Sequence, residues 1–225
     1  MHIEPGLVDG EKIWLSYITA ASVGAYTLKL ARGSLRERGA LSLLSRSAST
    51  TALVFCFFEV LPHYPIGISE VHLILGSTLF LIFGVAPAAI GLALGLLIQS
   101  LFFAPFDLPQ YGMNVTTLLV PLFGLTALAR RTIAPNTAYV DLKYRQALAL
   151  STTYQTGIVA WVAFWALYGQ GFTAENAAAI LSFGAAYMLV IIVEPLVDLA
   201  VLAGAKTLDQ LRGSALLERR LYEAA

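Results

Sequence analysis

The sequence predicts an all-α integral membrane protein, a bundle of about seven transmembrane helices. Its 225 residues are 58% hydrophobic and only 12% charged, and the mean hydropathy is +0.74. A chain of this size with so few charges is too apolar for a soluble domain. About twenty apolar residues cross a hydrocarbon core of roughly 30 Å, and the backbone inside it must satisfy its own hydrogen bonds, so each long apolar run is expected to be a helix.

Seven apolar runs are expected to form these helices. In chain order they cover residues 13–31, 43–61, 71–84, 88–104, 115–129, 147–168 and 177–203. The third is the shortest and depends on residues of the preceding loop. No charged n-region or cleavage site precedes the first run, so we expect no removable signal peptide and a retained initiator methionine.

Small residues recur at the spacing that lets helices approach closely. They are Ala20 with Gly24, Ala21 with Ala25, and Gly91 with Gly95. Packing within the bundle and docking of a separate membrane subunit are both open at these positions. The single cysteine, Cys56, lies in an apolar run, so we expect it to be buried and free of any disulfide.

The basic residues predict the orientation of the bundle. Thirteen of the 14 lysines and arginines fall on one predicted side, in the first loop, the loop after the fifth run and the tail. The exception is Lys12. This bias predicts a cytoplasmic C-terminus and an outer N-terminus. All three histidines, His2, His63 and His72, then map to the outer side.

The first two residues could form a metal chelate. The α-amine of Met1, the deprotonated amide nitrogen of His2 and its ring Nδ1 can close two fused chelate rings. His72 lies on the correct side to supply a fourth nitrogen. Nitrogen donors in a plane suit a late transition metal such as Ni(II) or Cu(II), whereas oxygen ligands suit magnesium or calcium.

Three segments of the chain are informative together: residues 1–6 (MHIEPG), 65–76 (PIGISEVHLILG) and 112–116 (GMNVT). They resemble the CbiM/NikM family, the substrate-capture component of cobalt and nickel energy-coupling-factor (ECF) ABC transporters. The resemblance implies that the N-terminal residues fold back into the bundle and bind the metal together with a loop histidine. Carried over, this implicates Met1, His2 and His72 as metal ligands. The family's loop has a serine two residues before its histidine, whereas Ser69 stands three before His72.

A ligating imidazole needs an acceptor for its other N–H group. The outer-side candidates are Asn114, Glu59, Glu70 and Asp107, with Asn114 favoured because it falls in the matching family segment. His63 lies four residues after Glu59, which would place both on one helical face. It could be a metal ligand, a partner of a ligand or an interfacial residue.

We therefore expect one transmembrane metal-binding domain over residues 1–205, its N-terminal segment folded into the outer face, and a cytoplasmic tail over 206–225. It would capture Co(II) or Ni(II) with high affinity as substrate, with no resident cofactor, in the cell's inner (plasma) membrane. The resemblance implies a transmembrane coupling subunit, cytoplasmic ATPase subunits and a small accessory membrane subunit as partners. The chain lacks a phosphate-binding GxxxxGK[ST] loop, so ATP hydrolysis is assigned to a partner. No basic cluster favours nucleic acid.

Two other functions stay open at this point. An intramembrane metal-dependent hydrolase could use the outer histidines with Glu59. A related capture protein for an organic vitamin could use Phe102, Phe103, Phe106 and Tyr111 as an aromatic pocket. Glu194 and Asp198, one turn apart in the last run, could be structural, could couple to a subunit or could line a release path, since buried acids in a membrane are costly.

Overall fold

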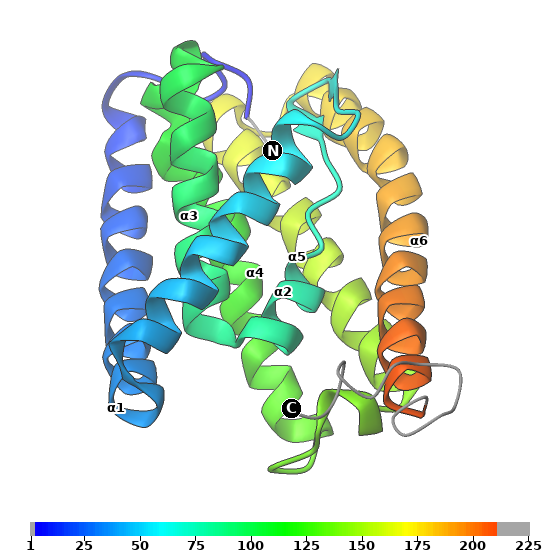
Figure 1. Cartoon of the computed structure of the whole chain (residues 1–225). Coiled ribbons are helices and arrows are strands. Elements are labelled where there is room, and N and C mark those ends of the chain that lie inside the picture. Colours follow the sequence, from blue (N-terminus) through cyan, green and yellow to red (C-terminus); the bar gives the residue numbers. More distant parts are fainter. Residues whose placement is uncertain (1–2, 211–225) are drawn as a thin grey trace.

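The computed structural model describes residues 3–210, and these form a helical bundle with a small β-hairpin at one end (Figure 1). The α-helices are α1 (Ile13–Glu59), α2 (Gly76–Phe83), α3 (Val85–Phe102), α4 (Tyr111–Thr132), α5 (Tyr144–Gln170) and α6 (Ala174–Gln210). Strands β1 (Tyr64–Ile66) and β2 (Ser69–Val71) form the hairpin. Short 3-10 helices are η1 (Gly10–Lys12), η2 (Pro105–Gln110) and η3 (Tyr139–Asp141).

Four helical stretches of the described chain are long and apolar enough to cross a membrane. They are Gly10–Glu59, Val85–Phe102, Pro105–Thr132 and Ala174–Gln210. The first described residues and the hairpin lie at one end of the bundle, and the α4–α5 loop lies at the other (Figure 1). The helical membrane character predicted from composition is confirmed.

Helix α1 combines the first two predicted runs. Gly39 interrupts it with φ 78° and ψ 169°, a conformation that side chains with a Cβ rarely adopt. The chain reverses there, so residues 13–38 and 40–59 form two arms of a V (Figure 1). The apolar runs were therefore predicted correctly, and a single glycine makes the turn between them.

The prediction of a spanning helix over residues 71–84 is wrong. Only Gly76–Phe83 is helical, which gives a length of about 12 Å against a core of roughly 30 Å. Strand β2 occupies the start of the predicted run, and residues 72–75 are non-helical. The apolar composition reflects burial inside the bundle rather than a lipid-spanning helix, because Ile74 and Leu79 are almost inaccessible.

The predicted small-residue pairs of the first and fourth runs have different environments. A Cβ on Gly91 would lie 2.3 Å from Thr50 Oγ1, and one on Gly95 would lie 2.6 Å from Val54 Cγ1. These glycines therefore allow α3 to pack closely on the second arm of α1. Gly24, by contrast, has open space around it. The expected burial of Cys56 is wrong, since this free cysteine is exposed.

Candidate metal centre

The first described residues pack beside the hairpin. Ile3 forms an antiparallel bridge with Ser69 of β2, and the amide of Glu4 donates a 3.1 Å hydrogen bond to the carbonyl of Ile68. Ser69 is completely buried. The N-terminal segment thus extends the two-stranded hairpin by one pairing, close to the strand that leads into His72.

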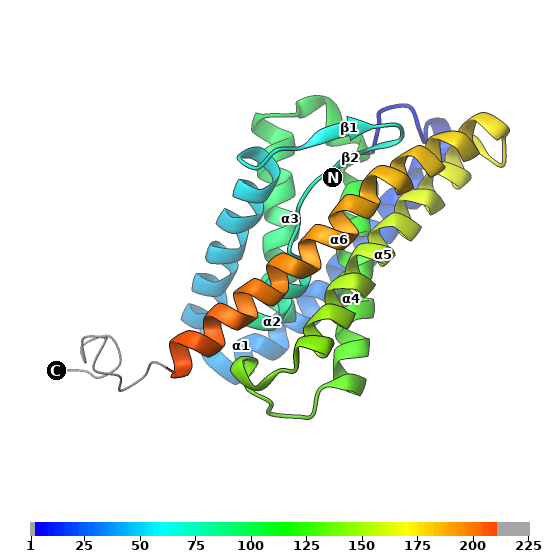
Figure 2. The same ribbon diagram turned by 90° about the vertical axis from the view of Figure 1, so that its right-hand side faces the viewer.

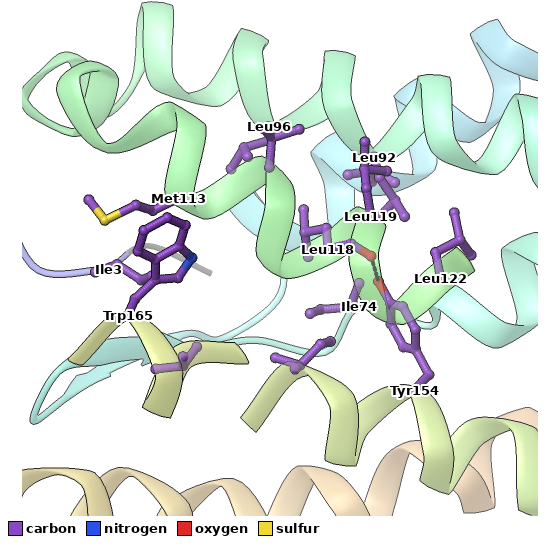
Figure 3. Packing of buried hydrophobic residues seen from close by; sticks show 14 of the residues in the cluster. Ile3, Ile74, Leu92, Leu96, Met113, Leu118, Leu119, Leu122, Tyr154 and Trp165 are labelled. Atoms are coloured by element: carbon purple, nitrogen blue, oxygen red, sulfur yellow. Dashed lines mark hydrogen bonds between the residues drawn. The ribbon is translucent and has the colours of Figure 1, made fainter. Parts of the chain in front are cut away.

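Ile3 is also held by a residue of helix α4. Its amide donates a 2.8 Å hydrogen bond to Oδ1 of Asn114, in the first turn of α4. Its side chain is fully buried and lies beside Met113 and Trp165 (Figure 3). The Nδ2 of Asn114 and the Nε1 of Trp165 are buried and have no hydrogen-bond acceptor within residues 3–210. Two polar donors are therefore concentrated where the N-terminal segment enters the bundle.

Helix α5 holds the next part of the segment. A Cβ on Gly169 would lie 1.9 Å from the carbonyl oxygen of Leu7, so the absence of a side chain permits this contact. Nε2 of Gln170 donates to the carbonyls of Gly6 (3.1 Å) and Leu7 (2.9 Å). Nζ of Lys12 donates to the carbonyl of Gly169 over 2.8 Å. Residues 6–12 are thus tied to the end of α5.

His72 lies directly after β2 and is 1% exposed. Its Nε2 is 2.9 Å from Oε2 of Glu70, and its ring centroid is 5.2 Å from that of Phe58. A carboxylate on one ring nitrogen fixes the orientation and the tautomer of an imidazole, an arrangement common for metal-binding histidines. Glu70 is thus the acidic partner of this ring, and Asn114 binds the amide of Ile3 instead.

His63 is close to His72 but not in the way the sequence indicated. Helix α1 ends at Glu59, so His63 lies in the loop and the predicted shared helical face with Glu59 does not exist. Its ring instead stacks on that of His72, with centroids 4.9 Å apart and planes 11° apart. Its Nδ1 lies 3.2 Å from the carbonyl of Leu61.

The remaining predicted site residues differ in their placement. Asp107 is buried within η2, and Glu59 is half-buried at the end of α1. Met1 and His2 lie outside the described residues. Within residues 3–210, no three His, Cys, Asp or Glu side chains come together as a set that could hold a metal ion.

The aromatic pocket expected for an organic vitamin is not formed. Phe102, Phe103 and Phe106 are 74%, 56% and 65% exposed, and Tyr111 donates its hydroxyl to the carbonyl of Ala93 on the neighbouring helix. Three of the four rings therefore point away from the interior.

Comparison with known proteins identifies the family. The family model described as "cobalt uptake substrate-specific transmembrane region", CbiM, matches residues 2–209. The chain belongs to the CbiM family. Among curated protein sequences, no match to this CbiM-family chain was found.

Two solved structures share the fold of this CbiM-family chain. The crystal structure of a transition metal transporter has a TM-score of 0.69 at 21% identity and covers 99% of this chain and 98% of its own. A truncated transition metal transporter has the same score and identity, over 90% of this chain and 97% of its own. The family is thus shown by the sequence model, and the fold by both structures.

Some residues that build this end of the bundle carried no sequence signal. Gly169 and Gln170 act through backbone contacts with a segment more than 150 residues away. The sequence singles out Glu194 as an acid within an apolar run, but its partners were not predictable because they are the backbone amides of residues 74 and 75 and the side chain of Gln155.

Proposed function

We propose that this protein captures Co(II) or Ni(II) at the outer face of the inner membrane and presents it for uptake driven by partner subunits. The metal is the substrate. Membership of a cobalt-uptake family supports this function, and so does the fold shared with transition metal transporters.

The observation that carries the proposal is the position of Ile3. This third residue is bound both to Asn114 and to the strand that leads into His72. Met1 and His2 directly precede this residue in the sequence, and we propose them as the N-terminal part of the metal site. The buried donors of Asn114 and Trp165 also favour a polar segment here.

The proposed ligands are the α-amine of Met1, the amide nitrogen and Nδ1 of His2, and a ring nitrogen of His72. Because Nε2 of His72 is engaged by Glu70, Nδ1 is the nitrogen proposed to bind the metal. Four nitrogen donors in a plane suit Ni(II) and the neighbouring late transition metals. His63, stacked on the ring of His72, limits its rotation.

In the proposed transport complex, ATP hydrolysis by partner subunits supplies the energy for uptake, as in ECF-type ABC transporters. A transmembrane coupling subunit and cytoplasmic ATPases are the proposed partners. Ala21, Gly24 and Ala25 supply a small-residue surface for the coupling subunit, because the alanines are exposed and Gly24 is surrounded by open space.

Metal analysis of the purified protein tests the proposed site. Protein with a native N-terminus and a C-terminal tag is expected to bind one equivalent of Ni(II) or Co(II). The same protein with an N-terminal tag, or with His2→Ala, is expected to lose this binding. Each change removes a proposed nitrogen donor while leaving residues 3–210 unaltered.

Titration with both metals then measures the preference between cobalt and nickel. Unchanged affinity in His2→Ala would disprove the chelate, and absence of metal binding by the native protein would disprove the proposed function.

A further inference from the structure

The segment that joins His72 to α2 is unusual for the interior of a helical membrane protein. Residues 72–75 are neither helix nor strand, and Leu75 has a left-handed φ of 52°. Ile74 is completely buried. A non-helical backbone at this depth needs external hydrogen-bond acceptors, since neither water nor a helix supplies them.

Glu194 of α6 supplies these acceptors. Its Oε2 accepts a 2.9 Å hydrogen bond from the amide of Ile74, and its Oε1 accepts from the amide of Leu75. The Nε2 of Gln155 donates to the same Oε1, and the hydroxyl of Tyr187 donates to Oε1 of Gln155 over 2.8 Å. Hydrogen bonds to a carboxylate are stronger than those to a neutral acceptor.

Helix α6 also contacts the far side of the same loop. Gly67, at the tip of the hairpin, is so close to α6 that a Cβ would lie 3.1 Å from the carbonyl of Ala179. Figure 2 shows α6 running from the hairpin toward the opposite end of the bundle. One helix therefore holds the loop at its tip and again two residues after His72.

The hydrogen bonds disfavour a role for Glu194 as a cation ligand on a release path. The two carboxylate oxygens together accept three N–H groups. A cation bound to Glu194 would displace these donors and leave the buried amides of Ile74 and Leu75 without an acceptor. The same carboxylate is well suited to fixing the local conformation.

We infer that Glu194 is a positioning residue for His72. It holds residues 74 and 75 in the one conformation that presents the imidazole to the metal, and it ties the metal site to α6. This inference rests on the proposed function, since it assigns to Glu194 an effect on metal binding that acts only through His72.

Asp198 provides a matched control, because it is a buried acid one turn further along α6. It accepts hydrogen bonds from the hydroxyls of Ser77 and Thr78, inside α2. Burial and the charge of Asp198 raise the pKa of the Tyr139 phenol in η3 to about 12. Asp198 therefore acts on α2 and the opposite end of the bundle rather than on the segment after His72.

A double-mutant cycle tests the inference. Glu194→Gln keeps the size of the side chain but presents an amide N–H to donors. We expect it to raise the Kd for Ni(II) on the order of 10-fold, as for other partners that orient metal ligands. In a His72→Ala background, Glu194→Gln should change the Kd by less than about twofold, because Glu194 affects metal binding only through His72. Asp198→Asn should lower the unfolding temperature while leaving the Kd near that of the wild type.

A spectroscopic readout separates positioning from general destabilisation. The visible absorption of bound Ni(II) should shift in Glu194→Gln in the same direction as in His72→Ala, and should be unchanged in Asp198→Asn. If Glu194→Gln does not fold, Tyr187→Phe loosens the same network more gently and should show the same dependence on His72.

Equal losses of affinity with and without His72, or an equal loss in Asp198→Asn, would overturn the inference. Metal binding by the native protein combined with either result would leave the proposed function intact. Absence of metal binding by the native protein would disprove both the inference about Glu194 and the proposed function.

Discussion

At the scale of single residues, the described part of the proposed metal site contains two histidines and the groups that contact them. His72 is held by Glu70 on one side and stacked on His63 on the other. Asn114 does a different task, because it accepts the amide of Ile3. The sequence pointed to all four residues but could not assign these pairings, which depend on where the loop leaves the helix at Glu59.

Asn114 offers a prediction on how the N-terminal segment is anchored. Asn114→Leu leaves the buried amide of Ile3 without an acceptor, which costs about 1–3 kcal/mol. The segment should then leave its place, and the Kd for Ni(II), measured by calorimetry, should rise roughly 10-fold. Asn114→Asp retains an acceptor and should bind metal more tightly than Asn114→Leu.

Thr126→Val is the control for Asn114, since this buried threonine on α4 bonds only to the carbonyl of Leu122 in its own helix among the contacts described. Its affinity should equal that of the wild type. If Asn114→Leu did the same, Asn114 would have no part in the site.

At the scale of elements, the sequence predicts correctly those apolar runs that form helices through their own backbone hydrogen bonds. Six of the seven runs are helical, because long apolar stretches in a membrane have no other way to satisfy their backbone. The run at residues 71–84 was misassigned because its first part does not form a helix: Val71 pairs within the hairpin, and the amides of Ile74 and Leu75 donate to Glu194. Hydropathy measures burial and does not reveal such distant acceptors.

The contact between α5 and the N-terminal segment yields a prediction at this scale. Gly169→Ala would place a Cβ 1.9 Å from the carbonyl of Leu7, so the segment must move away from α5. We expect weaker metal binding, by on the order of 10-fold, and faster proteolysis of residues 3–12. In a helix, alanine is otherwise favoured over glycine by about 1 kcal/mol.

Gly184→Ala is the corresponding control in α6, because nothing lies within 4 Å of its added Cβ. It should be neutral or stabilising and should not alter metal binding. A loss of affinity in both variants would indicate a general response to alanine rather than displacement of the segment.

At the scale of the whole molecule, small residues at the same four-residue spacing lie in two different environments. Gly91 is enclosed by Thr50, so it belongs to the packing of the bundle, while Gly24 is open and lies on an arm of α1 with many exposed apolar side chains. Spacing alone could not separate the two, since both obey the same small-residue rule. The core includes Leu92, Leu96 and Leu118 (Figure 3), and Ala20 and Val23 of this arm pack against it, whereas Ala21 and Ala25 are exposed.

This difference predicts opposite results for the same substitution. Gly91→Leu must displace Thr50, and overpacking of this kind costs roughly 1–3 kcal/mol, so its unfolding temperature in detergent should fall. Gly24→Leu should fold and bind metal normally, but its bulk should block close approach of a second membrane subunit. Copurification of a coupling subunit from native membranes measures this, with Gly204→Leu, equally open on α6, as the control. Assembly of Gly24→Leu at the level of the control would place the coupling subunit on another face of the bundle.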